Sequence, residues 1–242
     1  MRIAKILSSR NENAFGNPPA RIVCLGDSVT HGCFEVYINR FGKVDTVYDS
    51  TKSYVRLLQD QLLCLYPASA VSVINSGISG DGTTGALERF ARDVAPYSPD
   101  LVTVNLGLND CMAEDTETAL RRYKSNMKEL FYRIRSLGAE AMLVTPNMMC
   151  TYVDPALPEG VLRDIAAEAT RRQNDGTLDR FVNAARQIAE ENLVCVADTY
   201  AVWQAYAKAG VDTTALLANR INHPTAVLHD LFVQKILANI FE

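Results

Sequence analysis

Near its start, the chain contains the stretch Arg21-Ile22-Val23-Cys24-Leu25-Gly26-Asp27-Ser28. The first part shows little alternation of apolar and polar side chains, which is typical of a parallel strand covered by helices on both faces. The glycine and the polar residues that follow predict a sharp strand-to-helix turn. Such a turn presents Ser28 at the edge of the sheet, with its backbone N–H near a helix start. Alone, a turn of this composition fits an ordinary helix cap equally well.

Similar apolar runs recur along the chain and alternate with helical patterns. They predict further strands over Val71–Asn75, Leu101–Leu106, Glu140–Thr145 and Leu193–Ala197. Apolar residues at spacings of three and four predict a helix over 116–137, with Thr116 as its N-cap. Comparable patterns predict helices over 55–65 and 178–188 and a final helix over about 225–240. The alternation predicts an α/β fold, namely a three-layer α/β/α sandwich, flavodoxin-like, with a parallel sheet of about five strands.

Length and composition indicate how the chain is divided. It has 242 residues, 48% of them hydrophobic, which is enough to form a full core. No linker-like stretch interrupts it, so we expect a single domain over 1–242, with residues 1–20 as an N-terminal extension. The segments 33–52 and 147–175 are longer than the connections that a minimal sandwich needs, and we expect them to be insertions near the site. Each is either a binding loop or lid, or a surface elaboration with a small core of its own.

Charge, hydropathy and cysteine spacing argue against several classes of protein. The formal net charge is −4 and no basic stripe is visible, which argues against nucleic acid as a partner. No apolar run reaches the roughly 18 residues of a membrane span, and the N-terminus lacks the apolar segment of a secretory signal. We therefore expect no membrane span and a cytoplasmic protein. The cysteines form no CxxC pair, so no metal or other cofactor is expected, and Cys24 and Cys195 are predicted to be buried in strands.

Polar groups follow two of the other predicted strands and precede the last helix. The segments are Asn75-Ser76-Gly77-Ile78-Ser79-Gly80-Asp81, Gly107-Leu108-Asn109-Asp110 and Asn222-His223-Pro224. Glycines let a backbone approach a ligand closely, an asparagine amide can donate to an oxyanion, and histidine has an ordinary pKa near 6.5 that suits proton transfer. Each segment alone also fits a turn, a cap or a packing residue. Because parallel strands end at one edge of a sheet, we expect these groups to meet there.

Taken together, these motifs resemble a known family. Gly26-Asp27-Ser28, Gly77, Gly107-Leu108-Asn109-Asp110 and His223-Pro224 are similar, in this order, to the four signature blocks of the SGNH/GDSL hydrolases. The resemblance spans nearly the whole chain. It implies that Ser28 attacks an ester carbonyl and that His223 is the general base. It also implies an oxyanion hole formed by the backbone N–H groups of Ser28 and Gly77 and by the Asn109 side chain.

The sequence departs from the family pattern just before His223. The family usually has an aspartate three residues before it, where this chain has Arg220. The ring Nδ1–H still needs an acceptor to fix the reactive tautomer. The alternatives are the Asn219 side chain, a backbone carbonyl between Asn219 and Ile221, or a distant carboxylate such as Asp198, whose favoured interpretation is a helix N-cap. We hypothesise a Ser–His dyad oriented by a neutral acceptor.

Other residues near these motifs are expected to have supporting roles. Asp27 and Asp110 match motif positions but are expected to shape turns. His229 matches a histidine that the family often has six residues after the catalytic one, but Leu228 replaces the usual preceding glycine, so His229 is interpreted as structural. His31 is expected to lie in the pocket wall.

The resemblance implies a serine esterase or acylhydrolase that forms an acyl-serine intermediate on a small-molecule ester. A small acyl group such as acetyl, on a carbohydrate, is the leading interpretation, because Tyr37 and Tyr48 in the first insertion can stack on a sugar. One alternative is a lysophospholipase or thioesterase, which needs a longer apolar groove, and acyl transfer is another. A non-catalytic flavodoxin-like binding module is a third, against which the joint occurrence of Ser28, Asn109 and His223 argues. The sequence leaves the oligomeric state open.

Overall fold

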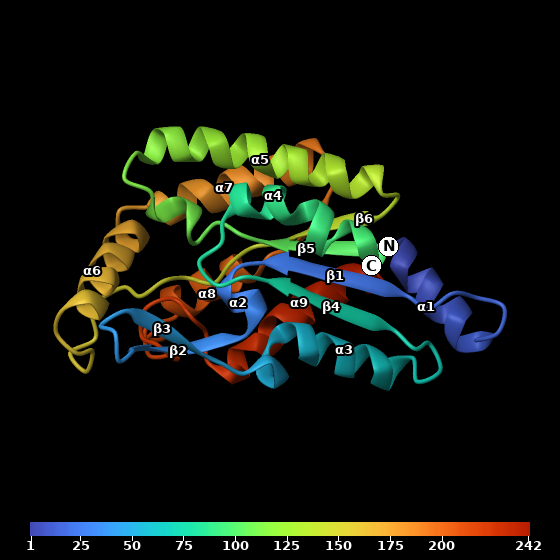
Figure 1. Cartoon of the computed structure of the whole chain (residues 1–242), viewed down its shortest axis with the longest axis horizontal. Helices are drawn as coiled ribbons and strands as arrows, with labels where there is room; N and C mark the ends of the chain where they lie inside the picture. Colours follow the sequence, from blue (N-terminus) through green and yellow to red (C-terminus); the bar gives the residue numbers. More distant parts are fainter.

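The computed structural model describes residues 1–242 and is built around a parallel sheet. The strands lie side by side in the order β4, β1, β5, β6, β7. Their bounds are Arg21–Gly26 for β1, Ser72–Gly77 for β4, Leu101–Asn105 for β5, Glu140–Val144 for β6 and Cys195–Ala197 for β7. Helices cover both faces of this sheet (Figure 1). The prediction of a three-layer, flavodoxin-like α/β sandwich with five parallel strands is confirmed.

Each face of the sheet has its own helix layer (Figure 1). One layer consists of α4 (Thr83–Asp93), α5 (Thr116–Ser136) and α7 (Thr177–Glu191). The other is formed by α3 (Tyr54–Leu65) and α9 (His229–Phe241). Helix α9 also contacts α1 (Arg2–Glu12) and α8 (Thr199–Lys208). The pairs α5–α7 and α3–α9 pack against each other most extensively within the two layers.

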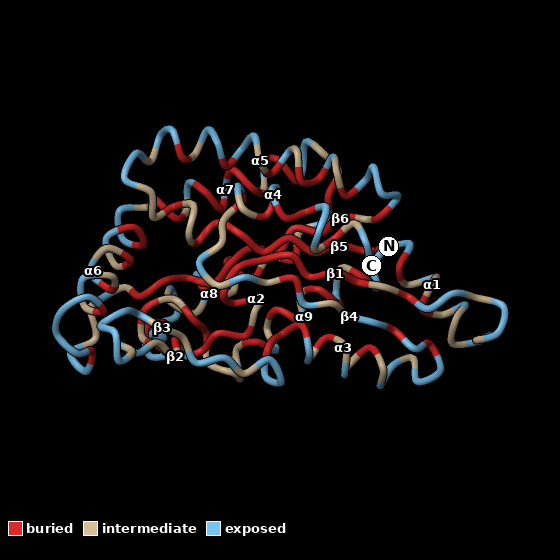
Figure 2. The backbone as a smooth tube through the Cα atoms, viewed as in Figure 1, coloured by how far each residue is buried: buried red, intermediate tan, exposed pale blue.

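The central strands are buried, as their apolar runs predict. Figure 2 shows buried residues along the sheet and exposed residues on the outer faces of the helices. In β1 and β5, every residue except Arg21 is buried. The buried side chains form one continuous apolar cluster that joins both helix layers to the sheet. Strands covered on both sides need no polar face, which explains why their sequences do not alternate.

Some local predictions need correction. The N-cap of α5 is Asp115 rather than Thr116, because the Asp115 carboxylate accepts a hydrogen bond from the Thr118 N–H at 3.0 Å. The last helix begins only at His229, after the short 3-10 turn Ala226–Leu228. Cys24 is buried as predicted, but Cys195 is exposed because β7 is one of the two edge strands of the sheet.

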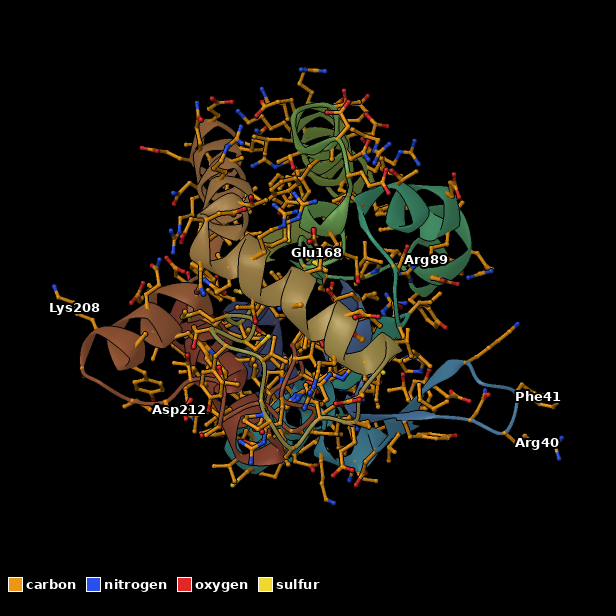
Figure 3. All side chains as sticks on the ribbon, turned by 90° about the vertical axis from the view of Figure 1, so that its left-hand side faces the viewer. Arg40, Phe41, Arg89, Glu168, Lys208 and Asp212 are labelled. Carbon is orange, nitrogen blue, oxygen red and sulfur yellow. The ribbon has the colours of Figure 1, made fainter.

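The two predicted insertions contain regular structure. Residues 33–52 form an antiparallel hairpin of β2 (Cys33–Ile38) and β3 (Val44–Tyr48), followed by the 3-10 turn η1 (Ser50–Lys52). Residues 147–175 include α6 (Val161–Asn174). Both lie at the carboxyl ends of the strands, on the left of Figure 1. Figure 3 views this end directly and shows Arg40 and Phe41 at the protruding tip of the hairpin.

The remaining elements are short. They are the one-turn helix α2 (Ser28–His31) and the 3-10 turns η2 (Ala95–Tyr97) and η3 (Asp110–Met112). None of the helices combines the length and the apolar character needed to cross a bilayer.

Two neighbouring aromatic residues of α5 provide a test of this packing. Phe131 is fully buried, whereas Tyr132 is 68% exposed. We expect Phe131→Ala to lower the free energy of unfolding by about 3–5 kcal/mol, because it removes buried contacts and leaves a cavity. Tyr132→Ala should change it by no more than about 0.5 kcal/mol. Urea unfolding followed by circular dichroism measures both, and equal effects of the two substitutions would contradict the orientation of α5.

Candidate active site

A pocket of about 290 Å³ opens at the carboxyl ends of the strands. The sheet, the hairpin, α6 and the loop before α9 all contribute to its lining: Ser28, Val36, Val44, Thr46, Ser79, Gly80, Asn109, Leu162, Ile165, Asn219, Ile221, Asn222 and His223. Three predicted site residues, Ser28, Asn109 and His223, therefore meet in one pocket, although they lie far apart in the sequence. Both insertions contribute walls.

The turn between β1 and α2 holds Ser28. Ser28 is the first residue of α2 and is 4% exposed. The Asp27 carboxylate caps the helix by accepting a hydrogen bond from the Val29 N–H at 3.0 Å, in agreement with its expected role in the turn. Burial raises the pKa of Asp27 to about 7, and the nearby Asp110 and Asp81 carboxylates add to the effect. The Ser28 N–H makes no hydrogen bond within the protein, so it is free to stabilise an anion.

The structure does not bring Gly77 into this pocket. Gly77 is the last residue of β4, and its N–H donates to the Asn75 side-chain oxygen at 2.9 Å. It lines a separate depression together with Arg89 and Tyr97. The predicted assignment of Gly77 as an oxyanion donor is therefore wrong, because that strand extends two residues further than predicted and keeps Gly77 in the sheet.

Gly80 lies at the pocket in place of Gly77. It belongs to the loop that follows β4, and its φ of +80° lies in the left-handed region that favours glycine. Its N–H makes no hydrogen bond within the protein. Gly80 and Gly77 belong to the same segment, Asn75–Asp81, and its sequence alone did not single out Gly80. The signal that distinguishes the two glycines is the position of the strand end, since only a residue beyond it can turn its N–H toward a ligand.

Asn109 follows β5 and is held by one of its two amide N–H groups. Its Nδ2 donates to the Asp81 backbone oxygen at 2.8 Å, which leaves the second N–H available to the pocket. The next residue, Asp110, accepts hydrogen bonds from the Thr83 N–H and hydroxyl at the start of α4. Asp110 thus shapes the turn, as expected.

The loop that carries His223 is folded around Asn219. The Asn219 side-chain oxygen accepts hydrogen bonds from the N–H groups of Ile221, Asn222 and His223 at 3.0, 2.9 and 2.9 Å. Arg220 within this turn has a φ of +58°, and its side chain lies 3.5 Å from the Asp154 carboxylate. Asn219 therefore holds the backbone of the loop, and its oxygen bonds to no atom of the imidazole.

The imidazole of His223 is oriented from the hairpin. Its Nδ1 lies 3.1 Å from the backbone oxygen of Phe34 in β2. Asp198, the other predicted candidate, caps α8 and pairs with Arg186, so it is not the acceptor. The neutral acceptor predicted from the missing aspartate is present, but it comes from a residue 189 positions away. Because it is a backbone group, no residue type in the sequence could have indicated it.

Burial keeps both histidines of this region neutral. Burial lowers the pKa of His223 to about 4, although the hydrogen bond with Phe34 acts in the opposite direction. His229 is also buried, its pKa is lowered to about 3, and its Nδ1 accepts a hydrogen bond from the Tyr54 N–H at 3.0 Å. His229 thus fixes the start of α3, which agrees with its structural interpretation. Ser28 and His223 line the same pocket without a direct hydrogen bond between them, as is common before substrate binds.

Other expected residues lie outside the pocket lining. The His31 ring contacts the Tyr48 ring at a tilted angle of 50°, with ring centroids 4.7 Å apart. The prediction that His31 lies in the pocket wall is wrong, because His31 is not among the lining residues. Tyr37 and Tyr48 are exposed on the hairpin and do not line the pocket either. No group of histidine, cysteine and carboxylate side chains has an arrangement that can hold a metal ion.

The pocket contains the parts that an acyl-transfer reaction needs. A serine hydroxyl, a neutral imidazole and three free N–H donors lie at one site in an α/β sandwich. A hydroxyl becomes a nucleophile when a base takes its proton, and N–H donors stabilise the oxyanion that forms. The fold and this set of groups agree with a hydrolase that acts on ester bonds.

The chain belongs to the GDSL-like Lipase/Acylhydrolase family, whose pattern matches residues 24–231. The acetylxylan esterase of Geobacillus stearothermophilus is 26% identical over 230 residues, which cover 91% of this chain and 93% of that relative. An arylesterase of Vibrio mimicus is 30% identical over 138 residues, covering 55% of this chain and 60% of the relative. A lipase/acylhydrolase structure from Enterococcus faecalis has the same fold, with a TM-score of 0.67, 23% identity and coverage of 91% and 95%. The protein is therefore an enzyme that hydrolyses ester bonds.

The buried state of His223 gives a prediction for its titration. The unfolded chain binds a proton near pH 6.5, but the folded ring does so only near pH 4. The unfolded state therefore binds more protons between these values, and the free energy of unfolding falls as the pH drops from 6.5 to 4. In NMR spectra we expect the His223 ring to remain neutral at pH 5.5, and the same residue in urea-unfolded protein to titrate near 6.5. A folded-state midpoint near 6.5 would contradict the burial of this ring.

Proposed function

We propose that this enzyme is a serine esterase that removes small acyl groups, foremost acetyl, from carbohydrates. The observation that carries the proposal is the meeting of Ser28, His223 and three N–H donors in one uncharged pocket. Ser28 is the nucleophile and His223 the general base. The backbone N–H groups of Ser28 and Gly80 and the side-chain amide of Asn109 form the oxyanion hole.

The reaction runs in two steps. The Ser28 hydroxyl attacks the ester carbonyl while His223 Nε2 takes its proton, and the tetrahedral intermediate places its negative oxygen at the N–H donors. His223 then returns the proton to the leaving alcohol, which leaves an acyl-serine. Water, activated by the same imidazole, releases the acid and restores the serine. A positioned base contributes about 10²–10⁴-fold to the rate, and one oxyanion donor about 2.7–4 kcal/mol.

The base works as a dyad with Ser28 rather than as part of a carboxylate triad. Donation from His223 Nδ1–H to the Phe34 carbonyl leaves Nε2 unprotonated, which is the tautomer that accepts the serine proton. A carbonyl stabilises the imidazolium less than a carboxylate does. The imidazolium therefore forms only transiently, while the oxyanion of the intermediate is present to balance its charge.

The lining of the pocket supports a small neutral acyl ester of a carbohydrate. No Lys, Arg, Asp or Glu lines it, so neither a charged acyl group nor a charged alcohol finds a partner. Its aliphatic walls suit an acyl methyl group or the apolar face of a sugar ring: Val36, Val44, Leu162, Ile165 and Ile221. Thr46, Asn219 and Asn222 offer hydroxyl and amide groups to sugar hydroxyls. The relative aligned over most of the chain is named an acetylxylan esterase.

The nucleophile is tested by substitution and labelling. Ser28→Ala should abolish nearly all esterase activity, since it removes the group that forms the acyl-enzyme. A fluorophosphonate should add one label to the unaltered enzyme and none to Ser28→Ala, read by intact mass. Ser79→Ala is a matched control in the same pocket and should be labelled like the unaltered enzyme. Undiminished hydrolysis by Ser28→Ala would refute the mechanism.

The substrate class is tested with a panel of esters. We expect activity on acetylated xylooligosaccharides, read by acetate release. On p-nitrophenyl esters, kcat/KM should fall about tenfold or more from acetyl to octanoyl, because added methylene groups exceed a site built for a small acyl group. Ser28→Ala assayed in parallel corrects for spontaneous hydrolysis. Equal or higher kcat/KM on the octanoyl ester would exclude the acetyl preference.

A further inference from the structure

Arg89 of α4 is a buried cation close to the candidate active site. Its side chain is only 7% exposed, although arginine keeps its charge at all relevant pH values. Figure 3 labels Arg89 on α4 and Arg40 at the hairpin tip. Burying a charge is costly unless good hydrogen bonds compensate for the lost water. The partners of Arg89 therefore indicate why it is there.

The guanidinium binds the segments that carry two of the three oxyanion donors. Its Nη2 donates to the Gly26 oxygen at 2.9 Å, two residues before Ser28. Its Nη1 donates to the Ser76 oxygen at 2.7 Å, close to the end of β4. Its Nε donates to the Asp81 carboxylate at 2.6 Å, one residue after Gly80. A planar fork of five N–H donors can hold several acceptors in a fixed relation, which a flexible ammonium cannot.

The third oxyanion donor is reached through Asp81. The Asp81 backbone oxygen accepts the hydrogen bond from Asn109 Nδ2 at 2.8 Å, while its carboxylate binds Arg89 and the Gly82 N–H. The orientation of the Asn109 amide therefore depends on the position of Asp81, which the guanidinium fixes. The only other side chain bound to Arg89 is Asp93, at 3.2 Å on the same helix.

We propose that Arg89 is the positioning residue of the oxyanion hole, where it fixes the Ser28 N–H, the Gly80 N–H and the Asn109 amide relative to one another. This inference rests on the proposed function, because the three donors are oxyanion donors only if Ser28 is the nucleophile. Arg89 does not line the pocket, so it acts through the backbone and touches no substrate. Its loss should lower kcat and leave KM nearly unchanged, since the donors act mainly in the transition state.

The test compares Arg89→Lys with Arg92→Lys on the same helix. Arg92 is 71% exposed and binds only Asp93, so its replacement controls for a change of arginine at this face. We expect kcat of Arg89→Lys to fall about 10²-fold, the loss that a misplacement of about 1 Å in catalytic groups can cause. KM should change little, and Arg92→Lys should retain the kcat of the unaltered enzyme. Circular dichroism and thermal unfolding establish that each variant is folded.

A rescue experiment separates positioning from general stability. Arg89 lines two surface depressions of about 200 and 330 Å³, through which a small cation can enter. In Arg89→Ala, millimolar guanidinium chloride should raise kcat at least about tenfold and leave KM unchanged, with sodium chloride at equal ionic strength as control. Asp81→Asn keeps the backbone acceptor for Asn109 but loses the charged partner of Arg89, so a smaller loss of kcat is expected. It provides the kinetic test if the Arg89 variants do not fold.

The activities of the Ser28 and Arg89 variants distinguish the proposed function from the positioning role of Arg89. If Ser28→Ala remains fully active, the proposed function is wrong, whatever the Arg89 variants do. If Ser28→Ala is inactive but folded Arg89→Lys and Asp81→Asn keep the kcat of the unaltered enzyme, only the positioning role is overturned. A rise in KM at constant kcat in these variants would overturn it as well.

Discussion

The parallel pairing of β1 with its two neighbours sets the geometry of the candidate site. Gly26 lies level with Gly77 of β4 on one side and with Asn105 of β5 on the other. Because the three strands end at the same level, the segments after them leave the sheet at one edge. Ser28, the Gly80 loop and Asn109 come together for this reason. Arg89 reinforces the arrangement by binding carbonyl oxygens at the ends of β1 and β4.

The imidazole reaches this edge by a different route. His223 follows the last strand by a long segment, so strand register does not place it. Its loop is folded by the hydrogen bonds that Asn219 accepts, and its ring is oriented by the Phe34 carbonyl. The first insertion thus orients the imidazole and also lines the pocket through Val36 and Val44.

Burial gives the pocket its electrostatic character. Charged side chains are kept out of its lining, and the buried imidazole is neutral over most of the pH range, as a base must be. Where bound substrate excludes water from the pocket, each N–H donor acts more strongly on an oxyanion, because less water competes for it. A neutral ester fits such surroundings, because no charged side chain lines the pocket.

Periodicity and local composition alone allowed the strands, the long helices and the fold class to be predicted. Side chains covered on both faces must be apolar over several residues, and that requirement is visible in the sequence. Ser28, Asn109 and His223 could be singled out for a similar reason, since each is a reactive residue type in a recognisable turn. The sequence also showed, through Arg220, that the usual carboxylate was missing.

Contacts between distant segments decided the rest. Whether Gly77 or Gly80 faces the pocket depends on where β4 ends, and the exposure of Cys195 depends on the strand order. Phe34 contacts the imidazole through its backbone carbonyl, a group that every residue has. Arg89 donates hydrogen bonds to three segments that lie close together only in the folded chain. These contacts follow from three-dimensional proximity rather than from residue type, so they cannot be predicted from the order of side chains along the chain.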